Sequence, residues 1–317
     1  MAVAFTFPGQ GSQAVGMGKD LADAFPEARR VFQEVDDALG ENLSKLIWEG
    51  PEETLTLTAN AQPALMAVSL AAIRALESRG FSLKGKVAYV AGHSLGEYSA
   101  LAAAGFVSVA DAARLLRIRG NAMQAAVPAG EGAMAAIIGL EQADVEAACA
   151  EAAQGTGNGS VCQIANDNGG GQLVISGAKA AVELAAKLCT EKGAKRALML
   201  QVSAPFHSAL MTPAAEIMRE ALAGVAKATP VVPIVPNVTV TPTSEPDEIA
   251  RRLFEQVVAR VRWRETVEWF GANGVTTLYE IGAGKVLSGL ARRINRDIAT
   301  TSVGTAAEVE AALASLG

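Results

Sequence analysis

A serine bracketed by glycines, Gly92-His93-Ser94-Leu95-Gly96, stands between an apolar segment at 86–91 and an Ala/Leu-rich segment that ends near Ala104. The first segment predicts a buried strand and the second predicts a helix. Glycine on both sides of the serine allows the sharp turn by which a strand enters a helix directly. The sequence therefore favours an α/β fold, with Ser94 as a candidate nucleophile at the turn.

The patterns on either side of this motif divide the chain into two subdomains. The outer parts of the chain predict a mostly parallel sheet with helices around it. The expected strands are at 2–7 and 276–281, and the expected helices are at 18–40, 60–79 and 109–126. The central stretch predicts the order β-α-β-β-α-β of a ferredoxin-like unit, over 132–140, 141–154, 161–167, 172–176, 178–193 and 196–202. We therefore expect a large subdomain of residues 1–128 and 203–317, and a small one of residues 129–202.

Composition excludes several classes of protein. The net charge of −6 argues against a nucleic-acid-binding protein, which usually carries a net basic face. We expect no membrane association, because charged residues interrupt every long apolar segment. The first residues lack the basic region of a signal peptide, so we expect a cytoplasmic protein. Three widely spaced cysteines favour reduced thiols over disulfides or a metal site, and we predict no bound cofactor.

A serine hydroxyl needs a base within hydrogen-bonding distance, and the chain contains two histidines. His93 directly precedes Ser94, so its side chain should leave the turn in another direction. His207 follows the predicted strand 196–202 on a turn, and it is the candidate base. No acidic residue stands in a clear position to orient its imidazole, so a backbone carbonyl is the expected partner. A merely structural histidine is the alternative.

Arg119 is the candidate substrate-binding residue. On the helix 109–126 it lies on the same face as Leu115, Leu116 and Met123, and an unpaired buried charge is costly. The carboxylate of a substrate would be a bidentate partner for this guanidinium. The alternative is an arginine that reaches solvent or pairs with a distant carboxylate.

Six segments in the same order give the chain a resemblance to a known family from end to end. It resembles the malonyl-CoA:acyl-carrier-protein transacylases of bacterial fatty-acid synthesis. The matching segments are Phe7-Pro8-Gly9-Gln10-Gly11-Ser12-Gln13, Gly92-His93-Ser94-Leu95-Gly96-Glu97-Tyr98, Arg119-Gly120 with Met123-Gln124, Pro205-Phe206-His207-Ser208, Pro236-Asn237 and Val261-Arg262-Trp263. The family often has proline where Arg260 and Ala283 stand here.

This resemblance implies an α/β-hydrolase-like large subdomain, with a mostly parallel sheet, interrupted by the ferredoxin-like one. It implies a malonyl ester on Ser94, His207 as base and acid, and a substrate carboxylate held by Arg119. It further assigns the oxyanion hole to the backbone N–H groups of Gln10 and Leu95, and the carbonyl that orients His207 to Gln256. The other substrate-binding residues that it implies are Met123, Phe206, Asn166 and Asn237.

The expected function is malonyl transfer from malonyl-CoA to the phosphopantetheine thiol of acyl carrier protein, by a ping-pong mechanism. Phe206, directly before the histidine, resembles the bulky residue of malonyl-selective members of the wider acyltransferase family, where that residue crowds an α-methyl branch. Two alternatives remain: a serine thioesterase or esterase with the same turn, and a non-catalytic module that docks carrier proteins. For docking an acidic carrier, the basic candidates are Lys195-Arg196 and Arg292-Arg293 with Arg296, and ordinary surface charge is the alternative.

Overall fold

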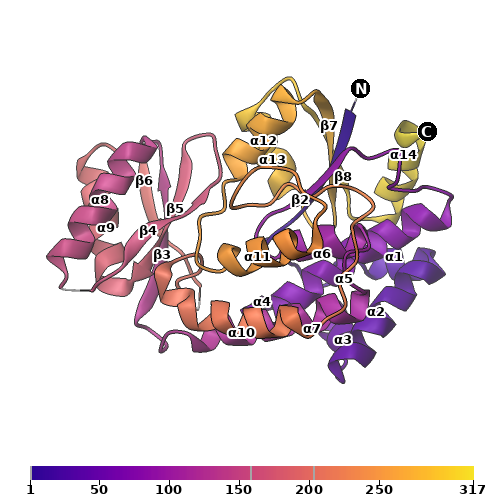
Figure 1. The fold of residues 1–317 in the computed structure, drawn as a ribbon, viewed down its shortest axis with the longest axis horizontal. Helices are drawn as coiled ribbons and strands as arrows, with labels where there is room; N and C mark the ends of the chain where they lie inside the picture. The colour runs from indigo at the N-terminus through magenta and orange to yellow at the C-terminus, as the bar shows by residue number, and fades with distance from the viewer. Residues whose placement is uncertain (1, 158, 203) are drawn as a thin grey trace.

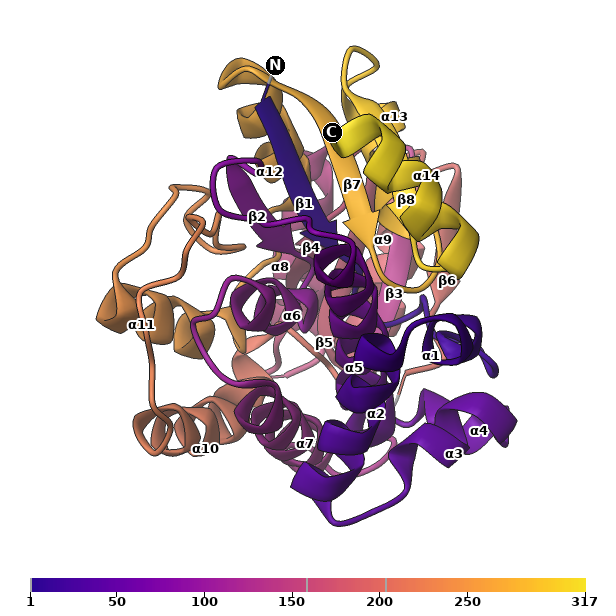
Figure 2. The ribbon, with the colours of Figure 1, turned by 90° about the vertical axis from the view of Figure 1, so that its right-hand side faces the viewer.

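A four-stranded parallel sheet forms the centre of the larger part of the molecule (Figure 1). The computed structural model describes residues 2–157, 159–202 and 204–317. Neighbouring strands are parallel in the order β2-β1-β7-β8, which can be followed in Figure 2 and confirms the expected mostly parallel sheet. The strands are β1 (Ala2–Phe7), β2 (Tyr89–Gly92), β7 (Val275–Ile281) and β8 (Ala299–Val303).

Helices cover both faces of this sheet. Successive residues of β1 point to opposite faces, so they enter two different hydrophobic cores. Phe5 and Phe7 pack into the larger core, and Ala4 packs into a smaller one. The smaller core is completed by α12 (Trp263–Ala272) and α13 (Val286–Ile294). The larger core is completed by α1 (Lys19–Ala24), α2 (Pro26–Leu39), α3 (Leu43–Glu49), α4 (Glu52–Thr56), α5 (Thr58–Ser78), α6 (Gly96–Ala103), α7 (Val109–Ala125), α10 (Thr212–Ala223), α11 (Pro246–Gln256) and α14 (Ala306–Leu316).

Several expected boundaries were wrong. The single helix predicted over 18–40 is two helices, because Phe25 is extended ahead of Pro26, whose ring disfavours helical backbone in the preceding residue. The strand predicted over 86–91 begins three residues later, at Tyr89. The strand predicted over 196–202 ends at Met199. The sequence patterns did not predict α3, α4, β8 or α14.

A second sheet, drawn from one continuous stretch of the chain, lies at the left of Figure 1. It is antiparallel, in the order β4-β5-β3-β6, and the helices α8 and α9 pack on it around a core of its own. The predicted ferredoxin-like order is therefore confirmed. Its elements are β3 (Gly132–Ile138), α8 (Gln142–Gly155), β4 (Cys162–Asp167), β5 (Gln172–Ala178), α9 (Lys179–Glu191) and β6 (Arg196–Met199).

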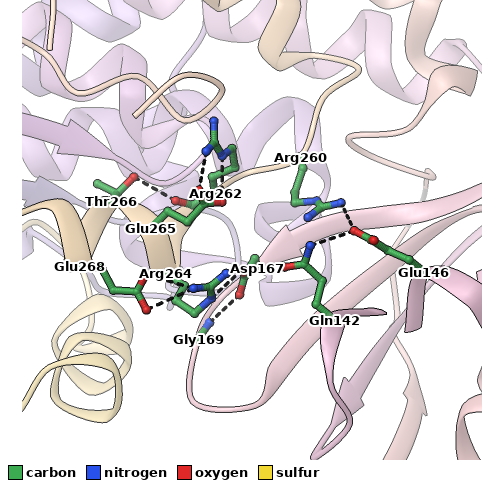
Figure 3. Close-up of polar contacts among 10 residues, drawn as sticks. All are labelled: Gln142, Glu146, Asp167, Gly169, Arg260, Arg262, Arg264, Glu265, Thr266 and Glu268. Atoms are coloured by element: carbon green, nitrogen blue, oxygen red, sulfur yellow. Dashed lines mark hydrogen bonds and ion pairs between the residues drawn. The ribbon is translucent and has the colours of Figure 1, made fainter. Parts of the chain in front are cut away.

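The segment 260–264, which leads into α12, is bonded to the end of β4 and to α8 (Figure 3). The backbone of Val261 exchanges hydrogen bonds with β4, accepting from Asp167 N–H at 2.9 Å and donating to the carbonyl of Ala165 at 2.8 Å. Arg264 reaches the buried carboxylate of Asp167, with Nε 2.8 Å from Oδ2. Arg260, where the family often has proline, pairs with Glu146 of α8 at 2.7 Å. These contacts fix the carboxyl end of β4 against the larger part of the molecule.

Within the described parts of the chain, no helix combines the length and the apolar character needed to cross a bilayer.

Candidate active site

Ser94 occupies a tight turn between β2 and α6. Its φ of 54° lies in the left-handed region, which is strained for a residue with a Cβ atom. The flanking glycines have no room for a side chain. A Cβ on Gly92 would lie 1.9 Å from the carbonyl carbon of Gly96, and a Cβ on Gly96 would lie 2.2 Å from the carbonyl oxygen of Phe7. The glycines therefore permit the turn that presents the serine at the start of a helix.

The side chain of Asn237 is hydrogen-bonded to the backbone of this turn. Its Oδ1 accepts a hydrogen bond from the Ser94 N–H at 2.9 Å, and its Nδ2 donates to the carbonyl of Gly92 at 2.7 Å. The residue is fully buried, and it is not among the residues that line the cavity next to Ser94. The structure thus places Asn237 beneath the turn and not at the substrate position expected from the sequence.

His207 lies within hydrogen-bonding distance of Ser94. Its Nε2 is 2.7 Å from Ser94 Oγ, and its Nδ1 is 2.9 Å from the backbone carbonyl oxygen of Gln256. A carbonyl can only accept a hydrogen bond, so the proton of the neutral imidazole is on Nδ1. This leaves the lone pair of Nε2 to accept the proton of the serine hydroxyl. The structure brings together the three residues that the sequence analysis assigned to this arrangement.

The surroundings of His207 keep the imidazole neutral. Burial lowers its pKa to about 3, and the positive charge of Arg119 acts in the same direction. Hydrogen bonding to Gln256 opposes the shift. A histidine that is neutral at physiological pH is in the form that can take a proton from Ser94.

Arg119 is buried on α7 and points at the same serine. Nη2 donates to Ser94 Oγ at 3.1 Å and to Oε1 of Gln256 at 3.0 Å, while Nη1 donates to Oε1 of Gln62 at 2.8 Å. The Tyr98 ring lies beside the guanidinium, with its centroid 5.6 Å from Cζ. Within the described residues, Nε of Arg119 has no acceptor and the guanidinium forms no ion pair. In that part of the chain, the guanidinium therefore keeps one unpaired N–H group, at the buried Nε.

Two backbone N–H groups border the same space. Leu95 directly precedes the first turn of α6, where N–H groups lack helical acceptors. The loop that contains Gln10 packs on the turn so closely that a Cβ on Gly9 would lie 2.7 Å from the carbonyl oxygen of His93. Both Gln10 and Leu95 line the cavity, and in the described chain neither N–H group has a protein acceptor. N–H groups of this kind can stabilise an oxyanion.

A cavity of about 400 Å³ opens onto Ser94 between the two sheets. Of the expected substrate-binding residues, Met123, Phe206 and Asn166 line it together with Arg119. As expected, His93 turns away from the serine: its Nε2 is 2.9 Å from Oδ1 of Asn168. Apolar walls come from both parts of the chain, with Met134, Ala136 and Val174 on the antiparallel sheet and Leu287 and Leu290 on α13.

The sequence analysis missed the polar residues Gln62 and Glu97. Gln62 lies on α5 and contacts Arg119, and Glu97 is a buried carboxylate on α6. All eight residues of α6 are buried, so a charge in that apolar helix was a signal that could have been used. Across residues 2–157, 159–202 and 204–317, no three His, Cys, Asp or Glu side chains gather as a metal site would require.

The sheet, the turn at Ser94 and the Ser94–His207 hydrogen bond together define an α/β protein of the class that carries a serine on a strand–turn–helix motif beside a histidine. Comparison with known proteins narrows this class. Residues 4–306 match the family model described as acyl transferase domain, and the chain belongs to that family.

Similar proteins extend over the whole chain. A malonyl CoA-acyl carrier protein transacylase of Bacillus subtilis (strain 168) is 48% identical over 314 residues, which cover 99% of this chain and 97% of that protein. The crystal structure of an acyl-carrier-protein-S-malonyltransferase from Bartonella henselae is 64% identical, with a TM-score of 0.97 and full coverage of both chains. A type II PKS acyl-carrier protein in complex with its malonyl-transacylase gives 44% identity and a TM-score of 0.94, covering 99% of this chain and 100% of that one. The resemblance stated from the sequence is confirmed.

Proposed function

We propose that this chain transfers a malonyl group from malonyl-CoA to the phosphopantetheine thiol of acyl carrier protein, through an ester on Ser94. The observation that carries the proposal is the convergence on one oxygen: Ser94 Oγ lies 2.7 Å from His207 Nε2 and 3.1 Å from Arg119 Nη2. The names of the similar proteins, transacylase and malonyltransferase, support the same reaction.

In the first half-reaction, Ser94 Oγ attacks the thioester carbonyl of malonyl-CoA while His207 Nε2 takes the hydroxyl proton. The N–H groups of Gln10 and Leu95 stabilise the oxyanion of the tetrahedral intermediate. The oxyanion then reforms the carbonyl as the carbon–sulfur bond breaks, and His207 gives its proton to the sulfur, so that CoA leaves as the thiol and His207 is neutral again. The carbonyl of Gln256 keeps the imidazole in the required tautomer throughout.

In the second half-reaction, the phosphopantetheine thiol gives its proton to His207 and attacks the ester carbonyl. The bond to Ser94 Oγ breaks, and His207 returns the proton to that oxygen. The competing acceptor is water, which would make the protein a hydrolase. A similar structure that holds a malonyl-transacylase together with its acyl-carrier protein favours the thiol acceptor.

Selection of the malonyl group is assigned to Arg119, with Met123, Phe206 and Asn166 around the acyl chain. A carboxylate is the partner to which a buried guanidinium with an unpaired N–H group donates most strongly. Phe206, at the cavity wall, crowds an α-methyl branch. One methyl group changes binding by only about 1–3 kcal/mol, so malonyl is preferred and methylmalonyl is not absolutely excluded.

The test is intact-protein mass spectrometry after mixing with malonyl-CoA, followed by addition of carrier protein. We expect one malonyl adduct on the parent protein, none on Ser94→Ala, and its movement to carrier protein that bears phosphopantetheine but not to carrier protein without it. Loss of the adduct without any carrier protein would indicate the hydrolase alternative. An unmodified parent protein would exclude the covalent mechanism.

The proposal includes two statements about organisation. Residues 129–202 form the small subdomain, and residues 1–128 with 203–317 form the large one. Separate hydrophobic cores support this division, although positions 1, 158 and 203 lie outside the described residues. The protein works in the cytoplasm, which is supported by its three free cysteines.

A further inference from the structure

The side-chain amide of Gln256 connects groups that the reaction uses with one that it does not. Its Nε2 donates to Glu97 Oε2 at 2.9 Å and to the carbonyl of Ser94 at 3.0 Å. Its Oε1 accepts from Arg119 Nη2 at 3.0 Å. A carboxylate and a carbonyl accept hydrogen bonds, whereas a guanidinium only donates them, so these neighbours fix the orientation of the amide.

Glu97 is the carboxyl group of this network, and it lies on the side of Gln256 that faces away from Arg119. Only 1% of the residue is exposed, and its Oε2 also accepts from the backbone N–H of Asn237 at 3.0 Å. In the described chain it forms no ion pair within 4.0 Å. Burial raises the pKa of Glu97 to about 7, and the contacts from Asn237, Gln256 and Arg119 oppose that rise. The positive charge that acts on this carboxyl is that of Arg119, which is joined to it through the Gln256 amide.

We propose that Glu97 and Gln256 are positioning residues for Arg119, and that they select malonyl groups by holding the counter-charge one amide away from the guanidinium. This inference rests on the proposed function. A carboxylate directly on Arg119 would occupy the N–H donors that the substrate carboxylate needs. A carboxylate behind an amide offsets part of the cost of burying the guanidinium. The amide oxygen accepts from Nη2 without placing a full negative charge on the guanidinium, and Nε keeps no acceptor within the described residues.

Gln256→Glu tests the separation of charges. The backbone carbonyl that orients His207 is unchanged, while the new carboxylate lies directly against Arg119. We expect kcat/KM for loading of Ser94 from malonyl-CoA to fall by about tenfold or more, relative to loading from acetyl-CoA. The acetyl group has no carboxylate, so it makes no contact with Arg119 that the substitution could weaken.

Glu97→Gln tests the remote charge. With its oxygen at the position of Oε2, the new amide still accepts from the Asn237 N–H and from Nε2 of Gln256, so the substitution removes the charge and keeps both hydrogen bonds. The buried guanidinium of Arg119 then loses the counter-charge that the proposal assigns to Glu97. We expect the malonyl-to-acetyl ratio of kcat/KM to fall by about tenfold, mainly through KM for malonyl-CoA.

Asp36→Asn is the matched control. Asp36 on α2 likewise accepts hydrogen bonds from a backbone N–H and a side chain, both from Ser44, and it is not among the residues that line the cavity. The malonyl-to-acetyl ratio of kcat/KM of Asp36→Asn should equal that of the parent protein.

The double variant Glu97→Gln with Gln256→Glu restores the hydrogen bond between the two side chains but keeps the carboxylate on Arg119. Its melting temperature should recover towards the parent value while the ratio stays low.

The outcomes separate the two proposals. A parent protein that forms no malonyl adduct refutes the proposed function. A parent protein that forms the adduct, with variants that lose malonyl and acetyl loading equally, overturns the positioning role, as does a double variant with the parent ratio. If Glu97→Gln does not fold, as judged by circular dichroism, Gln256→Glu alone decides.

Discussion

Ser94 and His207 share a left-handed backbone, with φ values of 54° and 55°, and their side chains meet at 2.7 Å. Both ends of this hydrogen bond are therefore held by strained residues that carry a Cβ atom. Strain of about 1–3 kcal/mol at each residue persists only where the surrounding structure enforces it. Here the glycines beside Ser94, the amide of Asn237 and the packing around His207 provide that enforcement.

Gly92→Ala should therefore abolish the site. The added methyl group would lie about 2 Å from the backbone of Gly96, so the turn must open. We expect a loss of stability of about 3 kcal/mol or more in denaturant titrations and no malonyl adduct by mass spectrometry. Gly289→Ala is the control, because a Cβ on Gly289 in α13 meets nothing within 4 Å. That change should be neutral or stabilising by about 0.5–1 kcal/mol. Equal effects of the two substitutions would contradict this account of the turn.

The sequence predicted the parts of the site that depend on local chemistry. Ser94 was predictable because glycines and a turn are adjacent in the chain, and His207 because only two histidines are present. The helical face of Arg119 followed from periodicity alone. The division into a parallel and an antiparallel sheet followed from the order of the patterns.

Contacts between distant segments could not be predicted. Gln62 meets Arg119 only because α5 packs on α7, and nothing near Gln62 in the sequence marks that partner. Asn237 was assigned to the substrate from its motif, yet its amide bonds to backbone 145 residues away in sequence, at Gly92. Such roles depend on tertiary packing, which hydrophobic periodicity does not describe.

His207 should remain neutral well below the pH at which an ordinary histidine is protonated. Its pKa is lowered to about 3 by burial and by Arg119, so at pH 5 the folded protein keeps the neutral imidazole. NMR spectra of the two imidazoles, assigned with His93→Gln, should show no titration of His207 between pH 7.5 and 5. A midpoint near 6.5 would contradict the prediction. The unfolded imidazole is protonated below its pKa of 6.5, so the contribution of His207 to the free energy of unfolding is lost as the pH falls from 6.5 towards 3.

Arg119→Ala should affect malonyl loading selectively. The substitution removes the only group proposed to bind the acyl carboxylate, and a lost charged hydrogen bond costs about 1.5–3 kcal/mol, or roughly 10- to 150-fold in kcat/KM. Single-turnover loading from malonyl-CoA and acetyl-CoA measures this directly. Arg119→Lys keeps the charge without the planar fork and should recover part of the malonyl rate. Equal losses with both substrates would show that Arg119 acts on Ser94 and not on the substrate carboxylate.

Carrier protein should dock beside α13. This helix lines the cavity with Leu287 and Leu290 and carries exposed Arg292 and Arg293 at its far end, followed by exposed Arg296. Changing these three arginines to glutamate should raise KM for an acidic carrier protein, while malonyl loading of Ser94 stays at the parent rate.

The matched control changes the same number of charges elsewhere, at the exposed residues Arg30, Lys45 and Arg114 on α2, α3 and α7. None of them lines the cavity, so KM for carrier protein should stay close to that of the parent. The difference between the two triple variants should shrink as salt is added, because surface charges more than about 8 Å apart are screened at physiological ionic strength. If both triple variants raise KM equally, only net charge matters and α13 is not the docking site. If neither does, Lys195 and Arg196 at the start of β6 are the remaining basic candidates.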